Sequence, residues 1–495
     1  MNTSPDGASP AKTLEILQRV FGHSSFRNSQ AQIIERSLAG QHSLVLMPTG
    51  MGKSLCYQLP AVATGGLCLV ISPLIALMKD QVDGLRAIGV DAGFINSSLG
   101  RAERERRQQQ LRSGQYCILY VTPERFRKQE FLEVLSERRV RLLAIDEAHC
   151  VSEWGHDFRP DYTRIGEFRR LMGSPPTILL TATATPRVQE DILAQCDLNP
   201  AEVRVFHEGV ERPNLRLEVT LCHGDDEKLQ RIRERLDTAR GSAIVYFSLI
   251  RTLERFSAEL AEAGVEHLCY HGRMDAGPRK RVQEAFMEGR VPVVLATNAF
   301  GMGIDKEDIG LIVHAELPGS LESYAQETGR AGRDGLPATC VLLYDEQDLL
   351  IQMDFIDWAN PSGDYLDRLL HLLSESPEEV NSNGLEWLRA QLSHRNRSDF
   401  RLETALNLLD RHGVTEGDLA ARTLCCTEDL GGDFADSLFD EAARKRKKLR
   451  DQQRLHQLVT WIRLESCRRQ FLHAYFGFED PPCGNCDACD SREPQ

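Results

Sequence analysis

The sequence predicts an α/β fold: two lobes built on parallel sheets, followed by a helical, winged-helix-like segment and a small cysteine-rich module. From residue 40 to 345, short runs rich in Val, Ile and Leu alternate with longer stretches of helical periodicity. Runs without polar alternation are typical of parallel strands covered on both faces, and the helical stretches between them supply the crossovers. The predicted strands are Leu44–Met47, Leu67–Ser72, Cys117–Val121, Leu142–Asp146, Thr177–Thr181, Ala243–Phe247, Val293–Thr297, Gly310–His314 and Thr339–Tyr344.

These strands are too many for one small sheet, and a break near Val203–Pro213 divides them. The pattern starts anew at Gly241–Phe247. We therefore expect a first lobe over residues 13–207 and a second lobe over residues 208–345. Ligands of such sheets bind at the carboxyl ends of the strands, so side chains at these ends are the first candidates for a site.

The composition is that of a globular protein with about three domains: 495 residues, 41% hydrophobic and 27% charged. No apolar stretch reaches the ~18 residues that a membrane span needs. Residues 1–12 have neither a basic start nor an apolar core, so we expect a disordered tail rather than a secretory signal. Ten of the fourteen Cys residues are scattered, as reduced core thiols are. This usage favours a reducing cytoplasm.

The net charge of −14 argues against a generally basic, nucleic-acid-binding surface. Local patches matter more than the sum, however, and residues 444–469 carry ten Lys and Arg against Asp451 and Glu465. Such a run is usually only a solvated helix face. Because it lies directly before a cysteine cluster, we expect Glu441–Tyr475 to form a basic helix or helical hairpin, and we assign residues 444–495 to one module.

After Asp345 the predicted strands stop, and residues 346–443 are expected to be helical. Three short helices are predicted, at Tyr365–Leu373, Leu385–Leu392 and Phe400–His412. A helix-turn-helix or winged-helix module fits this pattern, and a generic helical spacer fits it as well.

Residues 47–54 read MPTGMGKS and follow a predicted strand, with a helix expected from Ser54 onward. Glycines in such a loop let backbone N–H groups close around phosphate oxygens. Lys53 would reach the β and γ phosphates, and Ser54 would ligate Mg²⁺. The pattern departs from the usual phosphate loop only at Met47. The predicted nucleotide site consists of Thr49, Gly50, Met51, Gly52, Lys53 and Ser54.

Two acids and two arginines are expected to complete this site. Asp146 and Glu147 end a predicted strand: the first would hold Mg²⁺, and the second would polarise the attacking water. In the second lobe, Arg330 and Arg333 lie on one short segment. The functional interpretation is an arginine finger that reaches the γ-phosphate, against the alternative of a basic pair on the surface.

Five further segments accompany these motifs: Phe21–Gln30, Ser72–Gln81, Ser152–Pro160, Thr181–Thr185 and Ala296–Lys306. In this order the segments resemble the superfamily 2 helicases, and more narrowly the RecQ family of DNA helicases. The resemblance covers residues 14–345 and resumes near residues 444–490. It implies two RecA-like lobes, with ATP and Mg²⁺ bound between them, that move 3′ to 5′ on single-stranded DNA.

The resemblance also implies roles for single residues. Arg27 and Gln30 would contact adenine, and His23 would stack on it where the family usually has Tyr. In the family's aromatic loop, Trp154 and Phe158 would stack on bases of a single strand, at ~1–3 kcal/mol per base, with Arg159 adding charge. Three residues are expected to couple the nucleotide cleft between the lobes to the bound DNA strand: Thr181, Thr183 and Asp305.

Four cysteines end the chain with the spacing C-x15-C-x2-C-x2-C: Cys467, Cys483, Cys486 and Cys489. Four thiolates at this spacing fit a closed tetrahedral Zn²⁺ site, and an iron–sulfur cluster is the rival. The segment resembles the RecQ zinc module, which favours zinc in a structural role. In the usual RecQ arrangement a winged helix and a small helical DNA-binding domain follow this module; here we expect a short form without them.

The sequence therefore predicts an ATP-dependent 3′–5′ DNA helicase that unwinds duplexes during recombination and repair. Single-stranded and duplex DNA are the expected partners, and a single-strand-binding protein is a further partner implied by the resemblance. We expect the protein in the cytoplasm, associated with the nucleoid if it is bacterial. An RNA helicase or a double-strand translocase is one alternative. A clamp or annealing protein that uses ATP without robust unwinding is the other.

Overall fold

The structure of the chain is a computed structural model, and its contacts divide the chain into two compact units. One unit comprises Met1–Glu316, Glu322–Leu343 and Leu464–Gln495, and the other Leu317–Leu321 and Tyr344–Arg463. None of the described helices is both long and apolar enough to cross a membrane. The described residues are 10–48, 50–96, 99–152, 154–155, 162, 164–208, 212–301, 304, 306–392, 399–417, 419, 422–427 and 440–490.

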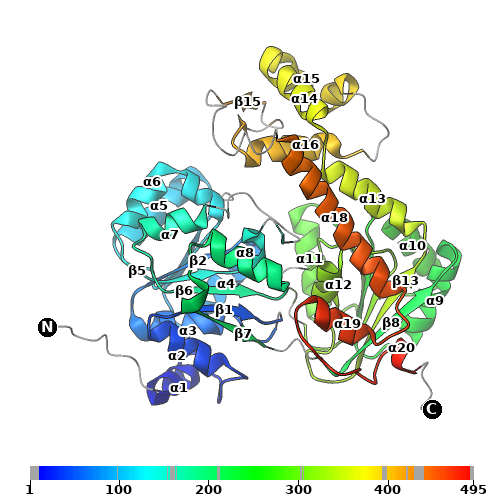
Figure 1. Ribbon diagram of the computed structural model, residues 1–495, viewed down its shortest axis with the longest axis horizontal. Helices are drawn as coiled ribbons and strands as arrows, with labels where there is room; N and C mark the ends of the chain where they lie inside the picture. Colours follow the sequence, from blue (N-terminus) through cyan, green and yellow to red (C-terminus); the bar gives the residue numbers. More distant parts are fainter. Residues whose placement is uncertain are drawn as a thin grey trace. The chain divides into compact units, whose positions relative to one another are not determined.

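The first lobe is a seven-stranded parallel sheet in the order β3-β4-β2-β5-β6-β1-β7. Alternate residues of one strand enter two separate cores: Leu44 and Leu46 face one, and Val45 faces the other. Helices therefore cover both faces of the sheet (Figure 1). The strands are β1 His42–Leu46, β2 Leu67–Ile71, β3 Ala92–Ile95, β4 Ile118–Val121, β5 Val140–Ile145, β6 Thr177–Thr181 and β7 Val203–His207; the helices are α1 Pro10–Arg19, α2 Gln30–Leu38, α3 Leu55–Thr64, α4 Ile75–Ala87, α5 Arg101–Arg112, α6 Gln129–Ser136, α7 Ile165–Leu171 and α8 Pro186–Gln195.

The second lobe is a six-stranded sheet in the order β10-β11-β9-β12-β13-β8. Its core takes Val245 from β9, Val313 from β12 and Phe256 from the covering helix α10. The strands are β8 Leu215–Leu221, β9 Ser242–Tyr246, β10 Leu268–Tyr270, β11 Val293–Ala296, β12 Ile309–His314 and β13 Ala338–Tyr344; the helices are α9 Asp225–Asp237, α10 Ile250–Glu262, α11 Ala276–Met287 and α12 Leu321–Thr328.

All nine predicted strands are confirmed, but four strands were missed: β3, β7, β8 and β10. Each of the four lies at an edge of its sheet. An edge strand has one free side and is often short or half-exposed, so it lacks the unbroken apolar run of a central strand. β7 occupies part of the predicted break, and only one of its five residues is buried. Helix α1 begins at Pro10, inside the predicted N-terminal tail.

The cysteine-rich module packs against β8, the edge strand of the second sheet. Leu217 forms a parallel bridge with Cys486, and the Val219 N–H donates to Asp487 Oδ2 at 2.9 Å. Asn485 Nδ2 donates to Pro213 O at 3.0 Å. The module therefore covers a strand edge that would otherwise be open to pairing with another chain. Its helices are α19 Arg468–Tyr475 and α20 Asp487–Asp490.

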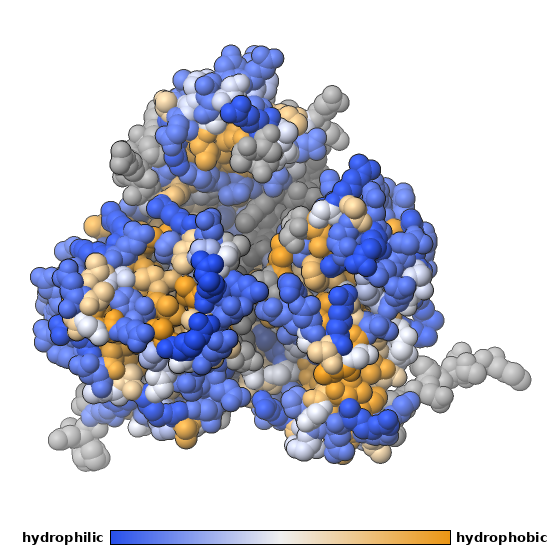
Figure 2. Space-filling view, turned by 180° about the vertical axis from the view of Figure 1, so that it is seen from behind, coloured by the Kyte–Doolittle hydropathy of each residue, from blue (hydrophilic) through white to orange (hydrophobic). Residues whose placement is uncertain are grey.

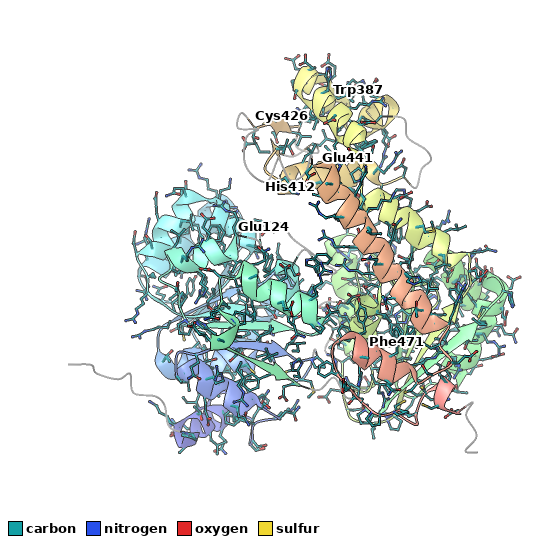
Figure 3. The ribbon with its side chains drawn as sticks, in the orientation of Figure 1. Glu124, Trp387, His412, Cys426, Glu441 and Phe471 are labelled. Carbon is teal, nitrogen blue, oxygen red and sulfur yellow. The ribbon has the colours of Figure 1, made fainter. Side chains whose placement is uncertain are left out.

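The second unit contains the helical segment and has a core of its own. The three predicted helices are confirmed, although α15 starts earlier than expected, at Pro377, and is interrupted at Gly384, where φ is +69°. Three helices followed by a two-stranded antiparallel hairpin match the winged-helix-like prediction. Trp387, His412 and Cys426 mark these elements in Figure 3. They are α14 Gly363–Glu375, α15 Pro377–Gln391, α16 Arg401–Arg411, β14 Thr415–Glu416 and β15 Cys425–Cys426.

Two further helices of this unit, α13 (Asp348–Ala359) and α18 (Glu441–Ile462), pack together. Lys448 pairs with Asp357 at 2.8 Å, and Asn360 Nδ2 donates to Asp451 Oδ2 at 2.9 Å. The predicted basic helix is thus α18, which ends before α19 begins. The expected module boundary between residues 443 and 444 falls inside α18. The face of the molecule that Figure 2 shows is mostly hydrophilic, with separate apolar patches.

Candidate functional site

The loop between β1 and α3 requires glycine at two positions. Gly50 and Gly52 have φ angles of +85° and +81°, which side-chain-bearing residues rarely adopt. A Cβ on Gly52 would also lie 2.6 Å from Gln30 Nε2. The loop therefore presents its backbone at close quarters, as a phosphate cradle must. Thr49 lies outside the described residues.

Lys53 follows this loop, and its ammonium group is buried. Within the described part of the chain, Lys53 Nζ has no hydrogen-bond partner. A buried cation without a partner is costly, because burial disfavours the charged form. An anion in the loop would remove that cost, so the site fits the phosphates of a nucleotide.

Gln30 holds the same loop from α2. Its Nε2 donates to Met51 O and to Gly52 O, both at 3.2 Å, and its Oε1 accepts from the Arg27 N–H at 2.9 Å. Gln30 is buried, whereas Arg27 is exposed beside the loop. The structure thus brings the two predicted adenine contacts to the phosphate loop and gives Gln30 a second role in shaping it.

The two predicted acids lie at the carboxyl end of β5, where the Asp146 N–H donates to Ile71 O at 2.8 Å. Burial, and next the adjacent Glu147, raise the pKa of Asp146 to about 6, while the charge of Lys53 acts in the opposite direction. The interaction with Lys53 shows that the acid and the lysine belong to one site. A buried carboxylate that resists ionisation is stabilised by a bound cation, and the site therefore fits Mg²⁺.

His149 connects these acids to the end of β6. Its Nδ1 lies 3.4 Å from Glu147 Oε2 and 2.9 Å from Thr181 Oγ1. The Thr183 N–H donates to Thr181 Oγ1 at 3.2 Å. The imidazole ring of His149 therefore lies between Glu147 and Thr181, and Thr183 bonds Thr181 in turn. His149 was not predicted, although its position two residues after Glu147 was the available signal.

The two predicted arginines have different surroundings. Arg333 lies against the phosphate loop: its side chain packs so closely on Gly50 that a Cβ at that position would be 2.9 Å from Arg333 Cδ. Arg330 is buried within the second lobe and donates through Nη1 to Gly301 O. In this conformation Arg333 contacts the first lobe, and Arg330 remains in the second.

Of the predicted aromatic loop, Trp154 is described, whereas Phe158 and Arg159, like Asp305, lie outside the described residues. Trp154 is half-buried against the first-lobe core. The Arg187 guanidinium lies 3.0 Å from its ring centroid, a cation–π contact. Its role as a stacking platform for bases stays a prediction.

The four cysteine sulfurs lie within 4.8 Å of one another. A tetrahedral Zn²⁺ with bonds of about 2.3 Å places its sulfurs about 3.8 Å apart, so the cluster fits one ion. Burial raises the pKa of Cys467, but the N–H groups of Cys483 and Gln470 and the thiols of Cys483 and Cys489 together outweigh it and lower the pKa to about 7. These donors stabilise thiolate, the form that binds a metal.

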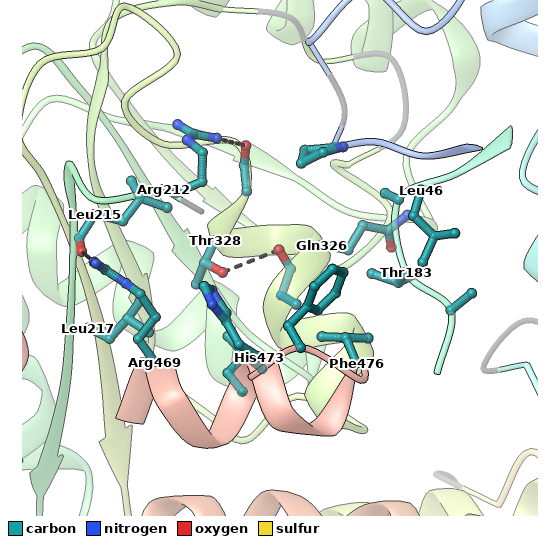
Figure 4. Close-up of a pocket in the computed structure, with 17 residues that line it drawn as sticks. Leu46, Thr183, Arg212, Leu215, Leu217, Gln326, Thr328, Arg469, His473 and Phe476 are labelled. Atoms are coloured by element: carbon teal, nitrogen blue, oxygen red, sulfur yellow. Dashed lines mark hydrogen bonds between the residues drawn. The ribbon is translucent and has the colours of Figure 1, made fainter. Parts of the chain in front are cut away.

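A mostly apolar pocket, which the sequence did not predict, lies close to these motifs. Phe476 and His473 of α19, Gln326 of α12, and Leu46 and Thr183 of the first lobe line it (Figure 4). Thr183 brings this pocket next to the chain of contacts that reaches Glu147.

Three protein-family models match the chain. Residues 27–192 match the DEAD/DEAH box helicase model, residues 227–335 the helicase conserved C-terminal domain, and residues 432–490 the RecQ zinc-binding model.

Whole-chain relatives agree with these matches. The probable ATP-dependent DNA helicase RecS of Bacillus subtilis is 34% identical over 482 residues, which cover 97% of this chain and 91% of that protein. The ATP-dependent DNA helicase RecQ of Haemophilus influenzae is 46% identical over 335 residues, 68% of this chain and 54% of that protein. The chain thus spans about half the length of the Haemophilus protein.

Solved structures share the fold at low sequence identity. The DUF1998 helicase MrfA bound to DNA aligns with a TM-score of 0.58 at 17% identity, over 88% of this chain and 64% of that one. The Mycobacterium smegmatis helicase Lhr, bound to single-stranded DNA and AMP-PNP, aligns with a TM-score of 0.54 at 20% identity, over 85% of this chain and 60% of that one.

Proposed function

The chain belongs to the RecQ family of ATP-dependent DNA helicases, and we propose that it couples ATP hydrolysis to 3′-to-5′ movement on single-stranded DNA and so separates duplexes during recombination and repair. The observation that carries the proposal is the Lys53 ammonium, which is buried beside Asp146, has no hydrogen-bond partner among the described residues and lies in a glycine loop that faces Arg333. Phosphoryl transfer needs charged groups of this kind around the phosphates, because the reaction depends on positioning and charge stabilisation.

In the proposed reaction the backbone of residues 49–54 cradles the phosphates, and Lys53 neutralises the charge on the β and γ groups. Ser54 and Asp146 would hold Mg²⁺, which screens charge between these phosphates. Glu147 orients the attacking water and accepts its proton, with His149 Nδ1 3.4 Å from its carboxylate. Arg27 and Gln30 contact the base.

Two arginines complete the site from the second lobe. Arg333, already against the phosphate loop, stabilises the charge that develops on the transferred group. Arg330 acts beside it from its buried position near Gly301. Because these residues come from different lobes, bound nucleotide draws the lobes together and hydrolysis releases them.

Single-stranded DNA is proposed to contact Trp154, Phe158 and Arg159 after the acids of the first lobe. Thr181 and Thr183, with Asp305, couple DNA binding to the nucleotide site. The contacts from Glu147 through His149 to Thr181 support this route.

The zinc site is proposed to be structural, with Cys467, Cys483, Cys486 and Cys489 as its ligands. Four protein ligands leave no open position for a substrate. A single-strand-binding protein is a proposed partner, and the cytoplasm, at the nucleoid in a bacterium, is the proposed location.

Strand separation on matched duplexes tests this function. The duplexes carry a 3′ DNA tail, a 5′ DNA tail or a 3′ RNA tail, with ATP and Mg²⁺ present. Unwinding of the 3′ DNA-tailed duplex alone is the expected result. ATP hydrolysis stimulated by single-stranded DNA without unwinding of any duplex would contradict the helicase and favour a clamp or annealing protein.

A further inference from the structure

We propose that His314 keeps the Glu327 carboxylate away from Arg330, so that the charge of Arg330 stays available to the nucleotide. His314 and Glu327 are positioning residues in this account. The inference rests on the proposed ATPase function and adds to it a reason why an acid can lie three residues before a catalytic arginine.

The pair is buried and closely bonded. His314 is the last residue of β12, and its Nε2 lies 2.7 Å from Glu327 Oε2 on α12. The two side chains are 1% and 10% exposed. A hydrogen bond between buried groups is electrostatically stronger than one in water, and burying either group without its hydrogen-bond partner is costly. The carboxylate is therefore held by the histidine.

Glu327 would otherwise have a second partner. Arg330 follows it by three residues, and the Arg330 N–H donates to Glu327 O at 3.2 Å. α12 ends at Thr328, and Arg330 lies in the turn that follows it, so the acid and the arginine are close in the chain, and a carboxylate near a buried guanidinium would be expected to pair with it. Here the carboxylate turns to β12 instead, and the guanidinium donates to another residue.

A neutral carbonyl oxygen holds the Arg330 guanidinium. It donates through Nη1 to Gly301 O, and over the described residues its Nε has no partner. Burial raises the pKa of Tyr246, so its hydroxyl stays protonated and donates to Phe300 O at 3.1 Å. A buried guanidinium with a neutral partner keeps its full charge for an incoming anion.

The sheet fixes the histidine against this group. Tyr246 ends β9 and pairs in register with His314 at the end of the neighbouring strand β12. Their rings stack with centroids 5.5 Å apart and planes 24° apart. His314 therefore contacts Glu327 through its ring nitrogen and Tyr246 through its ring face. The Tyr246 hydroxyl bonds Phe300, which precedes the Gly301 that accepts from Arg330. All of this lies at the carboxyl ends of strands, where the nucleotide is expected.

Second-site rescue tests the proposal. His314→Leu removes the donor and frees the carboxylate, so the kcat of DNA-stimulated ATP hydrolysis should fall roughly tenfold or more, as for the loss of a transition-state contact, with a smaller change in the KM for ATP. Adding Glu327→Gln removes the freed charge and should restore most of the lost kcat. Glu327→Gln alone should stay within about twofold of wild type, because the amide oxygen still accepts from His314.

A purely structural role predicts the opposite result. The losses caused by the two core substitutions would add, and the double variant would have a lower kcat than His314→Leu. That result, or an unchanged kcat in His314→Leu, would overturn the proposal. If His314→Leu does not fold, His314→Gln, whose amide can still donate, should keep near-wild-type kcat; a tenfold loss there would equally refute it. His267→Leu, a half-buried histidine of the same lobe that bonds Ser257 at 2.7 Å, is the matched control.

Wild-type activity separates this proposal from the proposed function. If the wild-type chain does not hydrolyse ATP with single-stranded DNA, the function itself fails, and the role of the pair fails with it. If the wild type hydrolyses ATP and the rescue is absent, only the role of His314 and Glu327 is lost.

Discussion

At the residue scale, the site is a set of buried charges whose usual partners are missing or turned elsewhere. Lys53 has no partner among the described residues, Asp146 resists ionisation, and only one carbonyl oxygen, that of Gly301, accepts from Arg330 over the same part of the chain. Each of these groups therefore carries a cost of burial that a nucleotide with Mg²⁺ would relieve. The same arrangement predicts that ligand binding will stabilise the first lobe by mass action.

The raised pKa of Asp146 predicts how Mg²⁺ dependence changes with pH. Burial and Glu147 raise this pKa to about 6, so below pH 6 the carboxyl is protonated and a proton competes with the cation. The Mg²⁺ concentration that half-saturates ATP hydrolysis should rise about tenfold per pH unit below pH 6 and level off above it. Titrations of Mg²⁺ between pH 5 and 7.5 measure this. A half-saturation point independent of pH would contradict the assignment of Asp146.

Most of the proposed site was predicted from the sequence, because its residues fall in short motifs of adjacent positions. Lys53, Ser54, Asp146 and Glu147 were predicted as a group, and the structure brings them to one edge of the sheet. The contacts of His149 with Thr181 and of His314 with Glu327 were not predictable in the same way. They join residues 32 and 13 positions apart through side-chain geometry that only the folded chain defines.

At the element scale, the central strands were predictable and the edge strands were not. β5 and β12 are buried along nearly their whole length and are mostly apolar, with only Arg141 and His314 interrupting or ending the runs. β7 and β10 have one free side and mixed exposure, so their sequences resemble loops. The start of α15 was missed for a different reason: Gly384 interrupts the helix, and only its second half showed a clear period.

The packing of the cysteine module on β8 predicts the effect of metal loss. Cys486→Ser removes a zinc ligand that also bridges to Leu217. The variant should lose its one equivalent of zinc and become sensitive to proteolysis over residues 464–490, because folding of such modules depends on the metal. Elemental analysis and limited proteolysis measure both effects.

Cys425→Ser is the control for this prediction, because Cys425 is an exposed cysteine of the hairpin and lies outside the cluster. It should keep its zinc. Iron with labile sulfide in the wild-type protein would contradict the zinc assignment, as would full zinc retention in Cys486→Ser.

At the scale of the whole molecule, the proposed helicase function requires coupling through the first lobe between DNA bound at the aromatic loop and nucleotide bound at the phosphate loop. The connection runs from Glu147 through His149 to Thr181 and Thr183. Trp154 begins the proposed DNA-binding loop a few residues later in the chain, and Ser152, which bonds its N–H at 3.0 Å, also bonds Asp191 of α8. The acids and the aromatic loop are thus joined through the same lobe.

Trp154→Ala tests this coupling. If the ring stacks on bases, the variant should lose DNA-stimulated ATP hydrolysis by roughly tenfold, the effect of one lost stack, and keep most of the basal rate. Phe168→Ala, a change in the same first-lobe core against which Trp154 packs, is the comparison for a packing defect. Equal losses of basal and stimulated rates in Trp154→Ala would show that the ring acts through packing.

The most direct test of the account compares the wild-type chain with Lys53→Ala for ATP hydrolysis and for single-stranded DNA binding, with the exposed Lys280→Ala as the matched control. The account predicts that single-stranded DNA stimulates hydrolysis by the wild type and by Lys280→Ala. Lys53→Ala should lose turnover and still bind the strand. Unchanged hydrolysis in Lys53→Ala would contradict the central claim that the buried lysine of the glycine loop holds the nucleotide.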